Sequence, residues 1–504
     1  VTSYLLVDFK CFILKCIKMK NFFYLFLIFM VLSSCGDFLE ERSEGKAYVT
    51  SCADLEELLV GEGYWNWENQ QNVLDMKNLP FLHLMDDDTE MCLLGNAHSY
   101  YEKLQAIYSW ERLPFNEKGN PFPDEAWKHF YHTISVANVV LDKLPEFSNE
   151  SLELRERIEG EALFIRAWNY YYLINLYAKP YSKTTSSMDP GVPVKLDPMI
   201  EDVFFSRQSV DSVYSLIVSD LEKAAVLLDG GLEETIYQAS EAAVHALLGR
   251  IYLYMGEYEL ALVHLEDPVF TSYALVDLSS ASLSSSSMEM EVIHSQMVDG
   301  GLVSKLSVDF QVSEELYYDM YDPEDQRGKF FFSSTYYGNR ICGKSVPSVG
   351  ALRVAELFLN RAEAYAMLEG QEEKAVENLR ALRSKRYVEG TSLEIVDSFK
   401  GLTGKELVDF IRQERRRELC FEGHRWFDLR RYAVFPKYPE SKMIRHNIYG
   451  EGASASEQVL LGYYILDTYD KDNGWVLPIP DYAIEFNDGA LENNEREDRT
   501  FFEL

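Results

Sequence analysis

The stretch from Arg412 to Tyr432, RQERRRELCFEGHRWFDLRRY, interleaves arginines and carboxylates with large aromatic side chains. At helical spacing Glu414 lies beside Arg417, and Arg425 lies beside Asp428. Charges set among so many aromatics favour a packed, internally paired ion network over a solvated face. The residues expected to form this structural network are Glu414, Arg417, Glu418, Glu422, Arg425 and Asp428.

Catalysis is the alternative chemistry for such carboxylates, because paired acids hydrolyse glycosidic bonds. The chain holds 82 acidic residues, so carboxylate pairs arise by chance and no single pair stands out. The sequence contains no nucleophile elbow, phosphate-binding loop, dinucleotide fingerprint or H-E-x-x-H zinc motif. A non-enzymatic protein without a cofactor is therefore predicted, and an acid-dependent hydrolase stays open as an alternative.

Metal-binding candidates are few. Hard cations such as calcium bind several carboxylate oxygens, and Asp86, Asp87 and Asp88 are consecutive acids. The spacing of an EF-hand is absent, so an acidic loop is favoured over a calcium site. His129 and His132 lie on a predicted helix without a third ligand at a suitable spacing, and they are interpreted as surface histidines.

The cysteines offer no zinc motif either. Beyond the N-terminal region the sequence places Cys52, Cys92, Cys342 and Cys420 far apart, without paired spacing. Four isolated thiols in a large core are the favoured interpretation, and a disulfide remains the alternative.

Composition limits the partners. The 504 residues carry 48 basic and 82 acidic side chains, for a net charge of −34. Such a surface repels phosphate backbones and anionic lipid headgroups, so nucleic acid is excluded as a partner and membrane association needs another device. The mean hydropathy of −0.21 is that of a globular protein, not of a multi-span membrane protein.

The N-terminal sequence supplies a device for membrane association. After Met19 and Lys20, residues 22–32 form an apolar run that fits a signal peptide and is too short to span a bilayer. The run ends in LSSC, which resembles a bacterial lipobox with Cys35 as the acylated residue; an ordinary secretory signal is the alternative. We expect residues 19–34 to be a lipoprotein signal peptide and residues 1–18 to be an over-extension of the reading frame.

Helical periodicity recurs along the rest of the chain. Small residues between large aromatics predict helices that approach closely in tetratricopeptide-like pairs, and Gly423 is expected to break the last of them. A Ser- and Tyr-rich insertion (279–337) separates the pairs, a short strand is expected at 291–293, and the glycine-rich sequence after Tyr432 is expected to form loops. The segments expected to be helical are 127–141, 160–177, 207–224, 242–266, 352–386 and 406–432.

These patterns carry a family resemblance. The run from Glu414 through Arg431 resembles the pattern E-R-x-x-E-L-x-F-E-G-x-R-x-x-D-L-x-R near the C-terminus of the SusD/RagB family, and WVLPIPDYAIEFN (475–487) resembles its L-P-I-P ending. The resemblance implies a mainly α SusD-like fold of about four tetratricopeptide-like helix pairs with long loop-rich insertions and a few short strands. It also implies one mature domain over residues 35–504, with an N-terminal portion over about 35–235 and a C-terminal portion over about 290–504.

The resemblance implies a function as well. Members of this family are lipid-anchored proteins on the outside of the outer membrane that bind a nutrient, usually a glycan, for a SusC-like TonB-dependent transporter. A scaffold that binds the transporter, with a peptide ligand or negligible ligand affinity, is the alternative. Aromatic rings that could stack on sugar faces, or pack in the core, are Trp65, Trp67, Trp110, Tyr317, Tyr318, Tyr321, Tyr336 and Tyr337.

Overall fold

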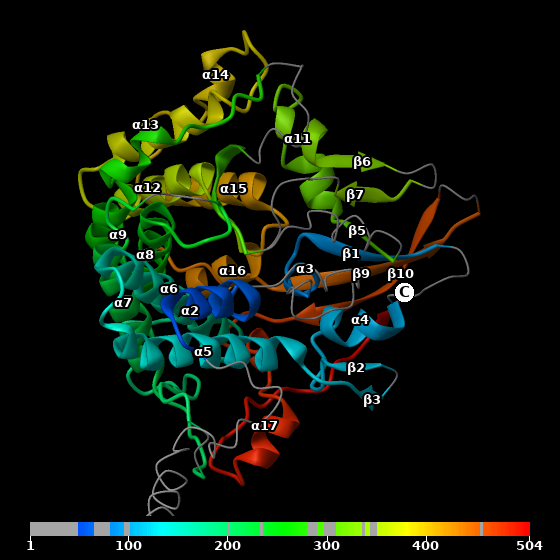
Figure 1. Ribbon diagram of the computed structural model, residues 1–504. Coiled ribbons are helices and arrows are strands. Elements are labelled where there is room, and N and C mark those ends of the chain that lie inside the picture. Colours follow the sequence, from blue (N-terminus) through cyan, green and yellow to red (C-terminus); the bar gives the residue numbers. More distant parts are fainter. Residues whose placement is uncertain are drawn as a thin grey trace, which may run out of the picture. The chain divides into compact units, whose positions relative to one another are not determined.

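The structure is a computed structural model, and its helices and strands belong to one compact unit, Ser51–Leu504 (Figure 1). The residues predicted as a signal peptide, and Cys35, lie outside the part of the chain that it describes. The described residues are 49–64, 81–94, 101–117, 119–199, 202–231, 235–279, 290–296, 309–334, 338–342, 350–453 and 457–504.

Long helices lie to the left of the strands in Figure 1. Neighbours in the chain pack on each other from α5 to α9, and α12 contacts α8, α9, α13 and α15. Each predicted helical segment contains one or two helices, although residues 352–353 form a strand and 207–209 and 384–386 are not helical. The mainly α fold with few strands is confirmed, whereas the tetratricopeptide geometry stays a prediction. The long helices are α5 (Glu125–Lys143), α6 (Leu152–Tyr177), α7 (Val210–Leu227), α8 (Glu241–Met255), α9 (Tyr258–Leu265), α12 (Val354–Met367), α13 (Glu372–Arg383), α15 (Gly404–Leu419) and α16 (Arg425–Val434).

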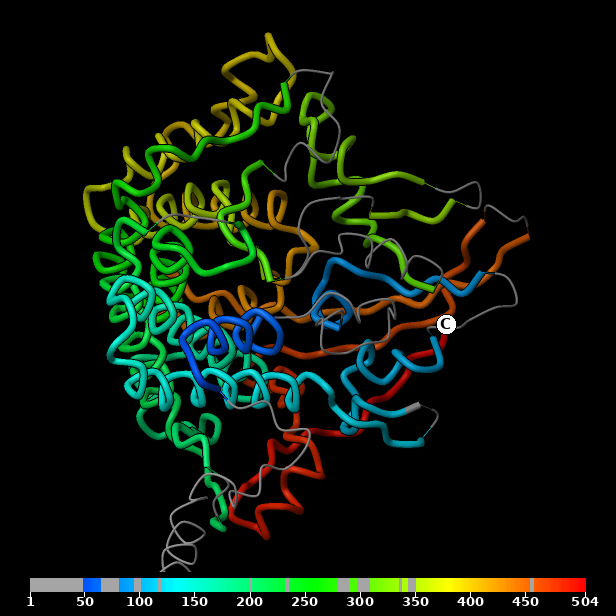
Figure 2. The backbone as a smooth tube through the Cα atoms, in the orientation of Figure 1, coloured from blue at the N-terminus to red at the C-terminus, as the bar shows by residue number. Residues whose placement is uncertain are grey.

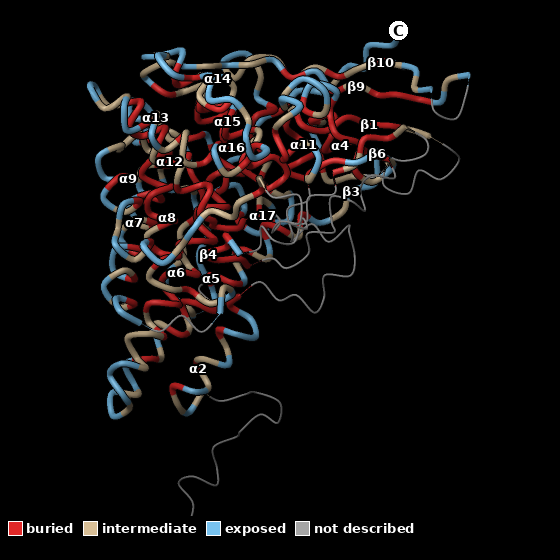
Figure 3. The backbone as a smooth tube through the Cα atoms, turned by 90° about the horizontal axis from the view of Figure 1, so that it is seen from above, coloured by how far each residue is buried: buried red, intermediate tan, exposed pale blue. Residues whose placement is uncertain are grey.

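Helix α6 lies at the centre of the helical side. Its second half is buried on every face, as expected for a helix that is apolar all round. Trp168 and Tyr172 pack on one another with ring centroids 5.6 Å apart, and Tyr172 also contacts Phe427 of α16. Figure 3 shows the buried residues concentrated where α6, α8 and α16 lie. The hydrophobic core therefore forms around this helix.

The close approach of α8 to α9 depends on one small residue. Ser240 caps α8, and Gly256 ends it with a φ of 71°. A Cβ on Gly249 would lie 2.4 Å from Cδ2 of Leu265, closer than real side chains come. The small residue at position 249 thus sets the distance between the two helices, as the sequence pattern predicts.

The main sheet joins distant parts of the chain. Its strands follow the order β11-β10-β9-β1-β5, with β1 parallel to β9 and antiparallel to β5. Figure 2 shows β1, from the N-terminal part of the chain, running beside the C-terminal hairpin of β9 and β10. The strands are β1 (Thr89–Leu93), β5 (Phe310–Val312), β9 (Ile444–Glu451), β10 (Gln458–Leu466) and β11 (Phe502–Glu503).

The loops expected after Tyr432 are wrong for this hairpin, since β9 and β10 are the longest strands of the described residues. Their glycines do not end the strands. Gly462 lies at an irregularity in the pairing, where a Cβ would lie 2.4 Å from the backbone oxygen of Phe502 in β11. Glycine here marks a close approach of two backbones within a sheet.

Short elements complete the unit. Strand β4 (Val292–His294) confirms the strand expected at 291–293 and pairs with β8 (Leu352–Arg353). The other strand pairs are β2 (Asn116–Glu117) with β3 (Asn120–Pro121), and β6 (Phe332–Ser334) with β7 (Arg340–Cys342). The short helices are α2 (Cys52–Leu58), α3 (Leu82–Met85), α4 (Tyr101–Tyr108), α11 (Gln326–Phe331), α14 (Leu393–Val396), α17 (Asp481–Phe486), η1 (Leu59–Gly63), η3 (Leu144–Phe147), η4 (Pro268–Ser272), η6 (Glu315–Asp319) and η7 (Asn473–Trp475).

Two further predictions concern the described residues. Cys52, Cys92, Cys342 and Cys420 are buried and form no disulfide among the described residues, as isolated thiols would not. No described helix combines the length and the apolar character that crossing a bilayer requires.

Candidate ligand-binding site

The predicted ion network is buried, and Glu418 of α15 lies at its centre. The Glu418 carboxylate accepts from Arg327 (3.0 Å), Arg353 (2.8 Å) and Arg386 (2.9 Å), and all four side chains are fully buried. Glu414, one turn earlier, shares Arg327. The remaining partners of this group are Arg383 and Arg417 on Glu414, Glu422 on Arg353, and Glu291 on Arg353 and Arg386.

The charge state of these carboxylates follows from their surroundings. Burial alone would raise the pKa values of Glu414 and Glu418, but the arginines around them hold both below the usual range. Both groups are therefore ionised, and neither can donate a proton as the acid of a hydrolase must. The charges of this group are paired internally, which agrees with the predicted structural role, and that role stays a prediction.

The expected pairing of Arg425 with Asp428 is wrong. Arg425 binds Asp87 through two hydrogen bonds of 2.7 and 2.9 Å. Asp428 instead accepts from Arg415 at 2.7 Å and from Arg431 at 2.8 Å. Helical spacing allowed the local pair, but Arg425 points to a distant partner, and Asp428 pairs with Arg415 of α15 and with Arg431 on its own helix. Gly423 lies in the break between α15 and α16 with a φ of 82°, although α15 already ends at Leu419.

The consecutive acids at 86–88 lie in a turn between α3 and β1, as the favoured loop interpretation expects, and the calcium alternative is untested. Asp87 also binds Lys442 at 2.6 Å, and Asp88 accepts from Arg416 at 2.7 Å. Asp86 is buried and accepts from the backbone N–H of Asp88 at 2.9 Å. Basic side chains thus pair with Asp87 and Asp88, and this turn is a largely buried partner of α15 and α16. These contacts hold the pKa of Asp87 well below its usual range against the effect of burial, whereas burial raises the pKa of Asp86.

Trp110 is a core residue and therefore unavailable for stacking on a ligand. Its side chain is fully buried, and its Nε1 donates to the backbone oxygen of Met85 at 2.9 Å. Its ring stacks on His446 with centroids 3.9 Å apart. Trp110 therefore packs in the core, which is the alternative given for the aromatic candidates.

Tyr321 is also engaged within the protein. Its hydroxyl donates to the backbone oxygen of Arg417 at 2.8 Å, and the Arg327 guanidinium lies 6.0 Å from the ring centre. These contacts fasten the insertion to the ion network, so the residue positions its neighbours.

Tyr318 is exposed at the surface, and Tyr317 beside it is half-buried. Both lie on η6, where their rings meet edge to face with centroids 4.8 Å apart. Tyr318 is 63% exposed, while the buried Arg340 lies 5.9 Å from its ring centre. We call Glu314, Tyr317, Tyr318, Asp319 and Arg340 the tyrosine patch. Its exposed ring and exposed carboxylates have the chemistry for stacking on a sugar face and binding its hydroxyls.

Four aromatic candidates cannot be placed beside this patch. Trp65, Trp67, Tyr336 and Tyr337 lie outside the described residues.

The structure contains a cavity of about 620 Å³ between residues 112–124 and the C-terminal segment 478–496, which was not predicted from the sequence. We call it the proline cavity. Its apolar lining includes Pro114, Phe115, Phe122, Pro478, Pro480 and Tyr482. The clustering of prolines in both segments is the signal that could have pointed to it, because proline stiffens the backbone on both sides of the cavity.

Asp124 lines the proline cavity and holds the start of α5. Its Oδ1 accepts from the backbone N–H groups of Ala126 (3.0 Å) and Trp127 (3.3 Å), and its Oδ2 accepts from the hydroxyl of Tyr177 at 2.5 Å. Burial raises the pKa of Asp124 to about 7. These hydrogen bonds hold this part of the lining in place.

Comparison with known proteins identifies the fold. Residues 37–253 match a family model described as starch-binding, associating with the outer membrane, and residues 332–495 match the model of the SusD family. SusD-like protein P38 of Formosa agariphila is 22% identical in an alignment of length 375 that covers 60% of this chain and 71% of that protein.

Comparison with solved structures gives the same fold. A SusD superfamily protein from Bacteroides fragilis superposes with a TM-score of 0.66 at 23% identity, over 88% of this chain and 99% of that one. A laminarin-binding SusD-like protein superposes with a TM-score of 0.57 at 18% identity, over 88% of this chain and 99% of that one. At these identities the superpositions establish the fold.

Proposed function

The chain belongs to the SusD-like family, and from that premise we propose that it binds a glycan at the cell surface and delivers it to a SusC-like TonB-dependent transporter. The proposal includes cleavage after residue 34 and a lipid anchor on Cys35 in the outer membrane. It is supported by the starch-binding, outer-membrane description of the matched family model and by the laminarin-binding structural neighbour. Binding, not catalysis, is the proposed output.

The observation that carries the proposal is the exposed ring of Tyr318. A large aromatic that is 63% exposed contributes little to the core, yet contacts with Tyr317 and Arg340 hold it in place. An aromatic ring that is ordered before binding loses little conformational entropy when a ligand stacks on it. Tyrosine also offers a hydroxyl at the edge of its apolar face.

The charge of the chain restricts the class of glycan. A net charge of −34 creates a potential that repels polyanions. The patch itself adds the exposed carboxylates of Glu314 and Asp319. A neutral oligo- or polysaccharide is accordingly the proposed ligand, in preference to a sulfated or uronic-acid-rich one.

Calorimetry of residues 36–504 against starch, laminarin, an acidic polysaccharide and a peptide pool tests this function. We expect a neutral glycan to bind and Tyr318→Ala to weaken it at least tenfold. Tyr237→Ala is the matched control, because Tyr237 is 44% exposed at another place. If both variants lose the same glycan affinity, the tyrosine patch is not the binding site.

The same panel separates the alternatives. Absence of any heat of binding, combined with capture of the transporter by the anchored protein, would favour the scaffold. Release of shortened glycans would favour a hydrolase. Labelling of cells with radioactive palmitate tests the anchor, and we expect incorporation that Cys35→Ala abolishes.

A further inference from the structure

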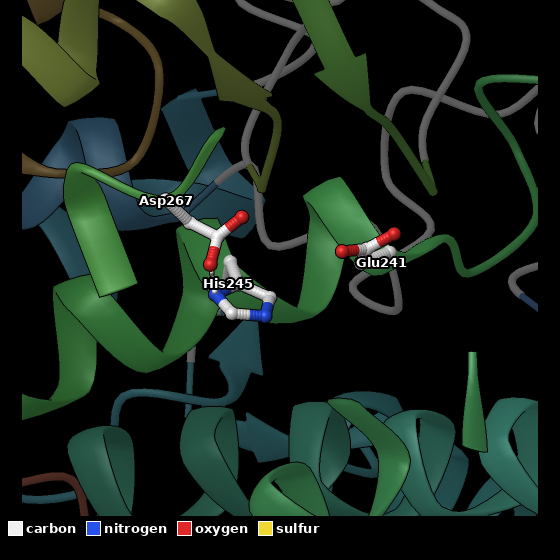
Figure 4. A group of neighbouring side chains, drawn as sticks. All are labelled: Glu241, His245 and Asp267. Atoms are coloured by element: carbon white, nitrogen blue, oxygen red, sulfur yellow. Dashed lines mark ion pairs between the residues drawn. The ribbon is translucent and has the colours of Figure 1, made fainter. Parts of the chain in front are cut away.

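Three side chains of metal-ligand type converge where α8 faces the turn after α9. Glu241, His245 and Asp267 each direct a ligand atom to within 4.8 Å of the others (Figure 4). Glu241 and His245 are four residues apart on α8, so they lie on one face of the helix. Asp267 follows the end of α9 and caps η4.

Backbone groups already orient the two carboxylates. Asp267 Oδ1 accepts from the N–H of Val269 at 2.9 Å, and Oδ2 lies 3.5 Å from Nδ1 of His245. Glu241 Oε2 accepts from the N–H of Gly230 at 3.0 Å. Such second contacts fix ligand geometry in metal sites.

A second histidine stands beside this group. His264 of α9 has its Nδ1 3.4 Å from Nδ1 of His245. The ring of His264 is held flat against Tyr252, with centroids 5.5 Å apart and planes at 10°. The Tyr252 hydroxyl in turn donates to Glu222. His264 is thus positioned by its own supporting contacts.

One separation already agrees with coordination geometry. Two ligands bound tetrahedrally to zinc at about 2.0–2.2 Å lie roughly 3.3–3.5 Å apart. His245 Nδ1 lies 3.5 Å from Oδ2 of Asp267, and a ligand atom of Glu241 lies within 4.8 Å of both residues. Imidazole nitrogens and carboxylate oxygens are the zinc ligands that this cluster offers, and a divalent cation would balance its two carboxylates.

We propose that Glu241, His245 and Asp267 form a binding site for a divalent transition metal such as zinc, with His264 as a supporting neighbour of His245. The ion would join α8 to the end of α9 and the turn that follows. The site belongs to the helical side of the fold and is separate from the tyrosine patch, so its occupancy affects stability and leaves glycan affinity unchanged.

Titration of the full-length chain, purified without a histidine tag, with zinc chloride in a calorimeter tests the proposal. We expect one zinc per chain, and cobalt(II) in its place should give the visible absorption of a tetrahedral ion. His245→Ala should weaken zinc binding at least tenfold. His132→Ala is the control, because His132 is exposed on α5 and pairs with Glu62 at 3.1 Å.

Asp267→Asn keeps an oxygen for the cap of η4 but removes the charge, so it separates metal binding from folding. It should fold, as judged by circular dichroism, and still bind zinc at least tenfold more weakly. The proposal is overturned if the unmodified chain binds no zinc, or if binding is the same in His245→Ala and Asp267→Asn as in His132→Ala.

Discussion

The Nε of Arg416 donates a hydrogen bond of 2.7 Å to Oδ1 of Asp88, a residue 328 positions earlier in the chain. The same guanidinium lies 3.1 Å from Glu315 on η6, the element that carries Tyr317 and Tyr318. Arg417, the next residue, donates to the backbone oxygen of Met320 at 2.6 Å. The charged helix α15 therefore positions both the start of β1 and the tyrosine patch.

Replacing Arg416 by Met keeps most of the side chain's volume but leaves Asp88 buried without its cation. We expect a loss of about 3–5 kcal/mol in the free energy of unfolding, because removal of one member of a buried pair strands the other charge. Urea denaturation measures it. Lys405→Met, which breaks an exposed pair with Asp409, should cost less than about 1 kcal/mol. If both variants lose a similar free energy of unfolding, burial of the Arg416–Asp88 pair does not determine its contribution to stability.

Acid should destabilise the protein through α15. Glu414 and Glu418 have pKa values below the usual range in the folded chain, so the folded state binds fewer protons than the unfolded one. Their contribution is complete above the unfolded pKa of about 4.3 and is lost as the pH falls further. We expect the urea midpoint to fall steeply below about pH 4.5. Glu418→Gln should lower the midpoint at pH 7 and flatten the acid limb, and an unchanged limb would exclude Glu418 as a source.

Asp124 should give stability a pH dependence of the opposite sign. Its folded pKa of about 7 exceeds the unfolded value of about 3.9, so its contribution to stability is complete below the unfolded value and is lost as the pH rises through about 7. Asp124→Asn keeps an N-cap oxygen and removes the titration. We expect this variant to show a flatter dependence of the urea midpoint between pH 4 and 8. Asp142→Asn, at a site far more exposed than Asp124, is the control and should leave the curve unchanged.

The sequence allowed the helices to be predicted because their signals are local. Caps, small residues and aromatic spacing identify α8 and α9 without reference to the rest of the chain. The hairpin of β9 and β10 was missed for the same reason. Its glycines resemble loop residues until β11 is seen beside Gly462.

The candidate site was only partly predictable. The carboxylates of α15 are recognisable as a network, but their partners Arg327 and Arg353 come from segments far away in the chain. Tertiary contact alone decides that Asp87 binds Arg425, and that Trp110 is core while Tyr318 is surface. The proline cavity likewise exists only once two proline-rich segments meet.

Gly249→Ala should loosen the helical side. The added methyl group would overlap Leu265 and force α8 and α9 apart, which costs about 1–3 kcal/mol in the free energy of unfolding. Thermal denaturation measures the loss. Gly61→Ala is the control, since a Cβ there meets nothing within 4 Å. A stability equal to that of the unmodified chain would mean that the two helices are not in close contact.

The two aromatic residues with opposite environments should separate stability from binding. Trp110→Phe removes the hydrogen bond to Met85 and part of the stack on His446, so we expect about 1–3 kcal/mol less stability. Because the residue is buried away from ligand, glycan affinity should stay within twofold. Tyr318→Ala should do the reverse, with a melting temperature near that of the unmodified chain and at least tenfold weaker binding. Calorimetric titration and thermal unfolding of both variants decide the matter, and weaker glycan binding by Trp110→Phe alone would return Trp110 to the list of ligand-contacting residues.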